Sequence, residues 1–280
     1  DDSDWDILDV PSMWQYRGYG EPTYPNIFYP FPFAPPHILR LNPVGCYRRE
    51  FTLDKSQMSD RAILHFEGVD NAFYVYINGL FVGFSKGSRL PAEFDVTNLL
   101  KEGKNTIAVK VYTYSDATYL ENQDMLMANG IFRDVYIIFC PKVALWDWEI
   151  ITNTTTLSLD ITLFEDAKNT KARITFNNNT ITLPIENGKC HYEVSPENVK
   201  LWSAEEPNLY DLTVEIFEND TVCEIHSKRV GFVFSEVVGR EFRVNGKKVV
   251  LRGINRHENN AKNGKALTAE QVRADLELIK

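Results

Sequence analysis

The stretch "RAILHFEGVDNAFYVYINGLFVGF", residues 61–84, decides the fold class of this chain. Apolar and polar side chains alternate in "RAILHF" and again in "AFYVYI", and β-branched and aromatic residues dominate both runs. A period of two residues is typical of strands that bury one face. Asn78-Gly79 separates the second run from "LFVGF", and this dipeptide favours a type I′ turn because it tolerates positive φ at both central positions. The stretch therefore predicts a β-hairpin within an antiparallel sheet.

The same strand signals continue on both sides of this hairpin up to about residue 250. "NTIAVKVYTYS" is a further strand of the first series, which ends near Cys140-Pro141. Seven strand-like segments then follow: "LWDWEII", "TLSLDITLF", "ARITF", "TITLPI", "CHYEV", "NLYDLTVEIF" and "CEIHSKRVGF". Seven strands in about 95 residues favour an immunoglobulin-like sandwich, although the Cys–Trp–Cys arrangement of antibody domains is not evident. The chain is therefore predicted to be mainly β, with two successive sandwiches.

The pattern changes after residue 236. "EFRVNGKKVVLRGIN" predicts a hairpin around Asn245-Gly246 that ends in an apolar strand. "LTAEQVRADLELIK" predicts a helix, because Thr268 and Gln271 fit a capping box and apolar side chains recur with helical spacing. A strand, a polar loop and a helix make one βα unit, which cannot cover its own apolar faces. We therefore expect these residues to begin a larger α/β domain, for which a (β/α)₈ barrel is the favoured form.

The composition limits the partners and the compartment. Thirty basic and 39 acidic residues give a net charge of −9, which argues against nucleic acid or an anionic membrane as the main partner. No apolar run approaches the roughly 20 residues of a membrane span. The four cysteines are scattered, so we expect free thiols and a cytoplasmic protein. The acidic start "DDSDWDILDV" contains no signal peptide, and a periplasmic location is the alternative if a removed N-terminus carried one.

Three polar clusters could carry chemistry, and each also has a purely structural interpretation. In "LRGINRHENN", residues 251–260, His257 and Glu258 follow the expected barrel strand, where functional side chains of such barrels project; solvation of a loop is equally consistent. The second histidine of an HExxH zinc motif is missing, which argues against a metal at this position. In "YPNIFYPFPFAPP", residues 24–36, the aromatics favour a structural strap, whereas the Asn26 amide suits sugar hydroxyls.

The third cluster lies in "YLENQDMLMANGIFRDV", residues 119–135. Its carboxylates and carboxamides, from Glu121 to Asp124, suit Na⁺, Mg²⁺ or Ca²⁺ and also polyol hydroxyls, although an exposed acidic loop is the simpler interpretation. Motifs for a Ser nucleophile, for nucleotide binding and for thiol catalysis are absent from the sequence. A pair of glycosidase carboxylates cannot be identified from the residues alone.

Several of these stretches resemble the N-terminal part of the lacZ-type β-galactosidases of glycoside hydrolase family 2. The matching stretches are "VPSMWQYRGYGEPTYPNIFYPF", "NPVGCYRREF", "FEGVDNAFYVYINGLFVGFSKGSRLPAEFDVTNLL", "YLENQDM" with "GIFRDV", "ENVKLWSAEEPNLY" and "LRGINRHENN". The resemblance implies a jelly-roll sugar-binding domain at 1–141, whose N-terminal strand is missing, and an immunoglobulin-like sandwich at 142–235. It also implies the truncated start of a (β/α)₈ catalytic barrel at 236–280.

The resemblance also implies an activity, which is retaining hydrolysis of terminal non-reducing β-D-galactosides such as lactose. Asn26 would reach into the galactose site, Asp124 would bind the galactose 6-hydroxyl together with a sodium ion, and His257 would contact the sugar and stabilise the transition state. The two catalytic glutamates and the ligands of the catalytic-site Mg²⁺ belong to later barrel strands. We therefore expect this chain to be inactive alone and the full-length enzyme to be a homo-oligomer. The role of Asn259 and Asn260, which replace a histidine pair of the family, is not assigned by the resemblance.

Two alternatives stay open from the sequence. Another family 2 glycosidase, a β-glucuronidase or a β-mannosidase, would share the same domains. A glucuronidase should place a cation beside the carboxylate of its sugar, whereas the acidic Asp124 favours a neutral 6-hydroxyl. A non-catalytic carbohydrate-binding module is the alternative of a different class.

Overall fold

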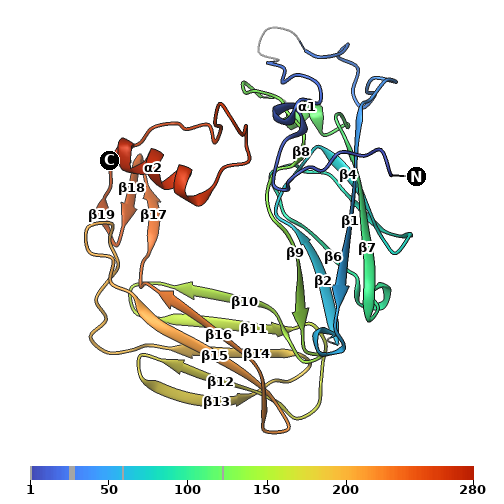
Figure 1. Ribbon diagram of the computed structural model, residues 1–280. Coiled ribbons are helices and arrows are strands. Elements are labelled where there is room, and N and C mark those ends of the chain that lie inside the picture. Colours follow the sequence, from blue (N-terminus) through green and yellow to red (C-terminus); the bar gives the residue numbers. More distant parts are fainter. Residues whose placement is uncertain (1, 25–28, 59, 122) are drawn as a thin grey trace. The chain divides into compact units, whose positions relative to one another are not determined.

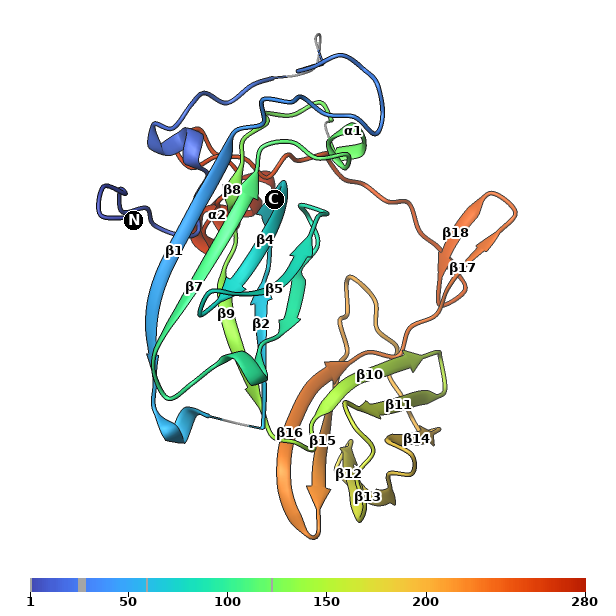
Figure 2. The same cartoon turned by 90° about the vertical axis from the view of Figure 1, so that its right-hand side faces the viewer.

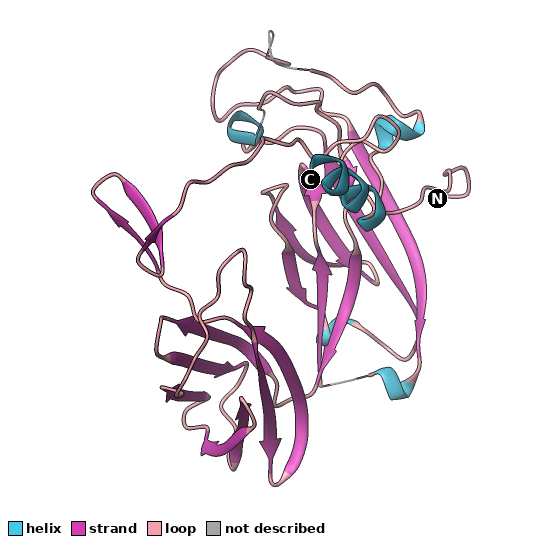
Figure 3. Cartoon of the chain, turned by 90° about the vertical axis from the view of Figure 1, so that its left-hand side faces the viewer, coloured by secondary structure: helices cyan, strands magenta, loops and turns pink. Residues whose placement is uncertain are grey.

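The computed structural model describes residues 2–24, 29–58, 60–121 and 123–280, which fold into two compact units. The first unit comprises Asp1–Phe139 together with Asn255–Lys280, and the second comprises Cys140–Ile254. Each unit has its own hydrophobic core. Both units are built mainly from antiparallel strands, as the alternating sequence pattern predicts (Figure 3).

The first unit is a sandwich of antiparallel sheets. One sheet has the order β1 (Val44–Leu53), β7 (Gly103–Tyr112), β4 (Ala72–Ile77) and β5 (Leu80–Ser85). A second has the order β6 (Ala92–Asp95), β2 (Arg61–Phe66) and β9 (Val135–Cys140), and a small third one pairs β3 (Val69–Asp70) with β8 (Gly130–Ile131). Figure 2 shows β1, β7 and β4 running side by side. These elements place the loops that contain the candidate site residues at the ends of the strands.

The hairpin predicted at Asn78-Gly79 is confirmed. Ile77 pairs with Leu80, and φ is 51° at Asn78 and 82° at Gly79, which is the conformation that a type I′ turn requires. The Asn78 amide donates to the Asn105 side chain at 2.9 Å, so the turn is also held from the neighbouring strand. A local signal in two residues thus determines the register of β4 and β5.

The core of the first unit consists of side chains that point inward from facing sheets. Phe66 from β2 and Phe73 from β4 are almost fully buried, and their ring centroids lie 5.0 Å apart. Trp14, in the 3₁₀ turn η1 (Trp14–Arg17), covers one end of this core. Gly45 in β1 leaves room for it, since a Cβ atom there would lie 2.5 Å from the indole ring. The sandwich therefore has an apolar interior closed by an N-terminal segment.

Short helical turns connect the strands of this unit. They are η2 (Lys55–Gln57), η3 (Thr97–Leu99) and α1 (Thr118–Glu121). The segment "DVTNLL", residues 95–100, is too short for a full helix and contains only the turn η3. α1 matters most for the site, because the acidic cluster begins at its end.

The second unit contains the seven predicted strands. Three form the sheet β10 (Leu145–Thr152), β11 (Leu157–Leu163) and β14 (Lys189–Val194); four form the sheet β13 (Asn179–Pro184), β12 (Thr170–Phe176), β15 (Tyr210–Glu218) and β16 (Thr221–Val230). Every pairing is antiparallel, and Leu159, Ile174 and Val214 are fully buried between the sheets. The predicted immunoglobulin-like sandwich is confirmed.

The segment after the second sandwich only partly follows the prediction. β17 (Ser235–Val238), β18 (Glu241–Val244) and β19 (Lys247–Lys248) form a small sheet, and the turn at Asn245-Gly246 is confirmed. The apolar strand expected over 249–254 is wrong, because these residues form no strand in the structure. A parallel barrel strand requires hydrogen-bonded neighbours, and the described residues offer it none. The helix is confirmed as α2 (Ala269–Ile279), with the Thr268–Gln271 capping box in place.

Membrane insertion and disulfides can be addressed for the described residues. None of their helices has the length and apolar character needed to cross a membrane. The four cysteines are free thiols.

Candidate active site

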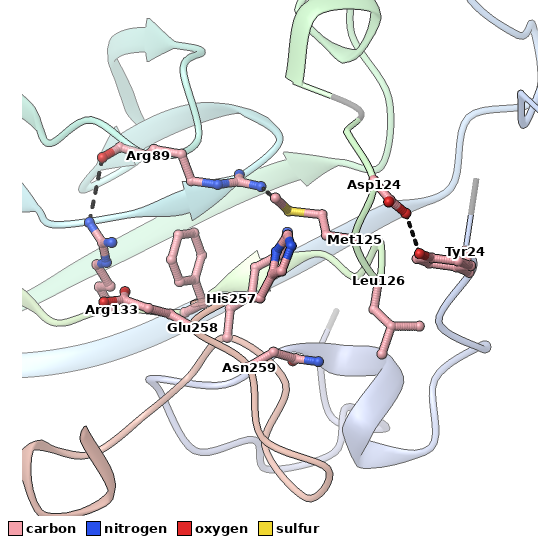
Figure 4. Close-up of a pocket in the computed structure, with 11 residues that line it drawn as sticks. Tyr24, Arg89, Asp124, Met125, Leu126, Arg133, His257, Glu258 and Asn259 are labelled. Atoms are coloured by element: carbon pink, nitrogen blue, oxygen red, sulfur yellow. Dashed lines mark hydrogen bonds between the residues drawn. The ribbon is translucent and has the colours of Figure 1, made fainter. Parts of the chain in front are cut away.

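A cavity of about 360 Å³ in the first unit brings together residues that are far apart in the sequence (Figure 4). Its lining includes Tyr24 from the N-terminal segment, Arg89 after β5, and residues 124–126 after α1. Arg133 after β8 and the loop that precedes α2 complete it. Loops at the end of the sandwich thus form its walls, as is common for binding sites on rigid scaffolds.

Asp124 lies in the wall of this cavity, and its carboxylate is exposed. The Tyr24 hydroxyl donates a short hydrogen bond to it. Glu121, in the same acidic cluster, is used differently: its carboxylate accepts hydrogen bonds from the Ser88 amide at 3.0 Å and the Ser88 hydroxyl at 2.5 Å. The cluster therefore separates into a structural carboxylate and an accessible one.

His257 lines the same cavity from the loop before α2, and Figure 4 shows its side chain directed into the cavity. The imidazole is exposed and makes no hydrogen bond with the described residues, which leaves both ring nitrogens open to a ligand. Arg256, next to it, is bound to Asp275 of α2 at 2.5 Å, so the loop is tied to the helix. The structure thus brings Asp124 and His257 to one cavity.

Asn26, the third predicted residue, lies outside the described residues. Its described neighbour Tyr24 lines the cavity. The aromatics that follow pack on the protein itself: the Tyr29 ring stacks on Tyr119 with centroids 5.5 Å apart, and Phe31 is buried edge-on against Tyr114. The strap interpretation of these aromatics is therefore the correct one.

Sequence reasoning missed a set of charged residues at this cavity. Asp70, at the end of β3, is buried and accepts hydrogen bonds from Lys265 Nζ at 2.7 Å, Arg89 Nη1 at 3.1 Å and Asn129 Nδ2 at 3.1 Å. Arg89 and Lys265 both line the cavity. A buried carboxylate with two cationic partners and an amide is fully satisfied. No local pattern could have indicated it, because Asp70 and Lys265 are 195 residues apart.

Arg133 is the cation of the cavity that is not bound to a carboxylate among the described residues. Its Nη1 donates to the backbone carbonyls of Glu67 at 3.4 Å and Arg89 at 3.5 Å, and its guanidinium lies 5.2 Å from the Phe132 ring centroid. Arg133 therefore adds a positive charge to the cavity wall and forms no ion pair with a carboxylate in the described part of the chain.

The described His, Cys, Asp and Glu side chains do not by themselves complete a sodium site at Asp124. Such hard cations take about six or more oxygen ligands. Nowhere in 2–24, 29–58, 60–121 and 123–280 do three His, Cys, Asp or Glu side chains gather closely enough to hold a metal. The Asp124 carboxylate is bound to Tyr24. Further oxygen ligands would have to come from residues other than these.

Comparison with known proteins agrees with this architecture. Residues 2–141 match the family model of the sugar-binding domain of family 2 glycosyl hydrolases, residues 142–232 match a second family 2 model, and residues 235–280 match the TIM barrel domain of the family. β-Galactosidases from Alteromonas mediterranea and Vibrio cholerae are 36% identical to this chain, and that of Priestia megaterium is 37% identical. The alignments cover 99–100% of this chain but only 29–30% of these relatives.

Solved structures share the fold at lower sequence identity. A β-glucuronidase of Bacteroides uniformis superposes with a TM-score of 0.76 at 24% identity, covering 100% of this chain and 35% of that one. An FMN-binding β-glucuronidase from Faecalibacterium prausnitzii superposes with a TM-score of 0.77 at 20% identity, covering 98% of this chain and 43% of that one. These similarities support the fold of each sandwich. This chain, with a sugar-binding sandwich, an immunoglobulin-like sandwich and the start of a TIM barrel domain, belongs to family 2 of the glycosyl hydrolases.

Proposed function

We propose that this chain forms the sugar-positioning wall of a retaining β-galactosidase that hydrolyses terminal non-reducing β-D-galactosides such as lactose. The observation that carries the proposal is the convergence of Asp124 and His257 on one cavity of about 360 Å³. A cavity of this size admits a monosaccharide. The identity of 36–37% to β-galactosidases along nearly the whole chain supports the choice of galactoside.

The chemistry of the two side chains suits this role. The Asp124 carboxylate accepts hydrogen bonds only, so it matches the donor of the galactose 6-hydroxyl, and the Tyr24 hydroxyl that it now binds stands in for that group. His257 offers a donor and an acceptor to the ring hydroxyls and helps to stabilise the transition state. Asn26 is the proposed third contact. The nucleophilic and acid/base glutamates of the retaining mechanism belong, in this proposal, to the part of the relatives that this chain does not match.

We also propose the cofactors, the location and the assembly of the full-length enzyme. A sodium ion at Asp124 and a catalytic-site Mg²⁺ accord with the resemblance, and both need ligands beyond the described His, Cys, Asp and Glu side chains. The free cysteines accord with a cytoplasmic enzyme, since reducing compartments preserve thiols. A homo-oligomeric full-length enzyme completes the proposal.

The decisive experiment compares two substrates in the full-length protein that contains this chain. Asp124→Ala should lower kcat/KM for nitrophenyl β-D-galactoside about a hundredfold or more and change it little for the 6-deoxy analogue, nitrophenyl β-D-fucoside, because only the first has the hydroxyl that Asp124 binds. Gln123→Ala, an exposed neighbour, is the matched control and should leave both values unchanged. An equal loss on both substrates would refute the role of Asp124, and absence of hydrolysis with retained galactose binding would instead indicate a carbohydrate-binding module.

The isolated chain offers a second test. Purified residues 1–280 should not hydrolyse nitrophenyl β-D-galactoside in a continuous absorbance assay. Hydrolysis that is measurable with this chain, and that is lost when one of its own residues is substituted, would contradict the proposal that the catalytic glutamates lie outside it.

Arg133 favours one specific alternative, a β-glucuronidase. Its guanidinium faces the cavity without a carboxylate partner among the described residues, and such a group can pair with the carboxylate of a glucuronide. The ratio of kcat/KM for nitrophenyl glucuronide and galactoside in the full-length protein decides between the two. A ratio above one that Arg133→Gln lowers would establish the glucuronidase.

A further inference from the structure

Asp70 and Lys265 form an ion pair that joins the loop before α2 to the sandwich of the first unit. Lys265 Nζ lies 2.7 Å from Asp70 Oδ2, and the side chains of the pair are only 12% and 6% exposed. Arg89 Nη1 binds the same oxygen at 3.1 Å, so the carboxylate has two cationic partners. Because both charges of the pair are largely removed from water, their attraction is less screened than that of a surface pair. The ammonium of Lys265 is thus committed to Asp70.

The residues that flank Lys265 also contact the sandwich. Gly264, with φ of 59°, is buried so closely that a Cβ atom would lie 2.6 Å from the Tyr16 ring. Ala266 packs against a small apolar cluster that contains Met13. The backbone of this part of the loop is therefore held against the N-terminal segment. Lys265 supplies a charged contact, and its neighbours Gly264 and Ala266 supply apolar contacts on either side of it.

A short chain of backbone hydrogen bonds leads from this anchor to His257. Asn260 and Gly264 exchange two backbone hydrogen bonds of 2.9 Å each, which closes the loop next to Lys265. The Asn259 amide then donates to the His257 carbonyl at 2.9 Å. Backbone hydrogen bonds and the chain itself thus connect the residue next to Lys265 with His257.

We propose that Lys265, through its ion pair with buried Asp70, is a positioning residue that holds the His257 loop at the wall of the sugar cavity. It acts on catalysis through His257. The activity readout rests on the proposed function, whereas the loop readout does not. Lys265→Met is the informative variant, since Arg89 remains to neutralise Asp70 and no buried carboxylate is left unpaired.

The first test measures the loop itself in the 280-residue chain by amide hydrogen exchange. Lys265→Met should increase exchange of the Asn260 and Gly264 amides about tenfold or more, because their mutual hydrogen bonds open when the anchor is lost. Lys262→Met removes an exposed lysine of the same loop and should change nothing. Lys265→Arg, which keeps a cation for Asp70, should retain most of the protection. Unchanged exchange in Lys265→Met overturns the proposal whatever the enzyme hydrolyses.

The second test measures activity in the full-length protein. Lys265→Met should lower kcat for nitrophenyl β-D-galactoside about tenfold or more with little change in KM. A misplaced contact to the transition state slows the chemical step more than it weakens binding of the substrate in the ground state. In a His257→Ala background the same change should cost nothing further. Equal losses in both backgrounds would show that Lys265 acts by another route. If the full-length protein does not hydrolyse galactosides even without these substitutions, the proposed function fails. The hydrogen-exchange test of the loop is still valid in that case.

Discussion

The two sandwiches of this chain use burial in opposite ways. Among the described residues, the buried polar and charged side chains of the first unit are Ser12, Asp70, Asn71, Ser88, Asn105, Thr113, Ser115, Thr118 and Asn129, whereas the second unit buries only Thr170. The charged pairs of the second unit lie at its surface, as with Arg173 and Glu215, which are 2.5 Å apart. The interior of the second sandwich is therefore an ordinary apolar core. The first includes polar groups that are satisfied by one another beside the cavity.

Most of the buried polar residues of the first unit belong to a network of two hydrogen-bonded groups, which meet at the adjacent residues Asp70 and Asn71. The Asn71 amide donates to Thr118 Oγ1 at 3.2 Å and, at 3.4 Å, to the Glu121 carboxylate. The Asn129 amide joins Asp70 to the backbone carbonyl of Thr113. Buried polar groups are costly unless every partner is present, and a complete network fixes a single arrangement. The network lies next to Asp124 and His257. This location indicates that the first unit has buried polar groups in place of apolar ones where they make the site rigid.

The largest effect is expected in the apolar core of the second unit. Phe176→Ala removes a ring that is buried against Phe232, with centroids 6.0 Å apart, and should lower the free energy of unfolding of this unit by about 4 kcal/mol. Urea denaturation followed by circular dichroism measures the loss. Amide protection of β7 should stay unchanged, because the core of the first unit contains no residue of the second. Loss of protection in both units would contradict separate cores.

The next effect tests the charge of the first unit. Asp70→Ala leaves Arg89 and Lys265 without their shared carboxylate and should destabilise the first unit by about 3 kcal/mol, since breaking a buried pair exposes the cost of an uncompensated charge. The partial exposure of Arg89 keeps the value at the lower end. Asp95→Ala, which removes an exposed carboxylate from β6, is the control and should cost less than about 1 kcal/mol. Equal costs would mean that burial of Asp70 has no energetic role.

The same contrast explains which parts of the molecule were predictable from the sequence. The hairpin at Asn78-Gly79 and the capping box at Thr268 are local, so a few adjacent residues determine them. The seven strands of the second sandwich follow from alternation, because their cores are apolar. The strand expected over 249–254 was wrong because apolar character alone supplies no hydrogen-bonding neighbour.

The site was predictable only in part. The residues alone indicated the two polar clusters that contain Asp124 and His257, and the resemblance singled out these two side chains and their roles. They do share a cavity, but their roles in sugar binding stay predictions. Asp70, Arg89 and Lys265 were missed, since a charged residue in a strand, as at Asp70, or in a loop, as at Arg89 and Lys265, is normally exposed. Their pairing exists only in three dimensions, so neither composition nor periodicity could indicate it.

One substitution made in both units sharpens the comparison. Thr118 and Thr170 are both buried, and Thr→Val replaces only the hydroxyl of each with a methyl group. Thr118 Oγ1 accepts from the Asn71 amide and from the Ser115 backbone amide, so Thr118→Val leaves two buried donors unpaired and should cost about 2 kcal/mol. Thr170 donates to the backbone carbonyls of Ala167 and Ile185, which lie just beyond the ends of β12 and β13, and Thr170→Val should cost about 1 kcal/mol. Urea denaturation of the two variants measures the difference, and a larger cost at Thr170 would contradict the network.

The smallest effect at neutral pH concerns Tyr47, a half-buried residue of the first unit whose hydroxyl is buried outside the network. Burial raises the pKa of Tyr47 to about 12, and the backbone of Ile131 opposes the shift only in part. The hydroxyl makes no hydrogen bond of normal geometry with the described residues. Tyr47→Phe should therefore change the free energy of unfolding at pH 7 by less than about 1 kcal/mol, or raise it slightly, because no partner loses a bond.

The effect of Tyr47 becomes visible at alkaline pH. The folded chain holds the phenolic proton more tightly than the unfolded chain, whose tyrosine has a pKa of about 10, so the stability linked to Tyr47 is complete below pH 10 and falls as the pH rises towards 12. The loss reaches about 1 kcal/mol near pH 11 in the wild type, and Tyr47→Phe should not show it. Denaturant titrations of both proteins between pH 8 and pH 11 measure the difference. If the stability of the two proteins fell equally between pH 8 and pH 11, the Tyr47 phenolate would be tolerated in the folded sandwich. Burying this hydroxyl without a hydrogen-bond partner would then cost little free energy, and a complete network would matter less to the first unit than the comparison of the two units suggests.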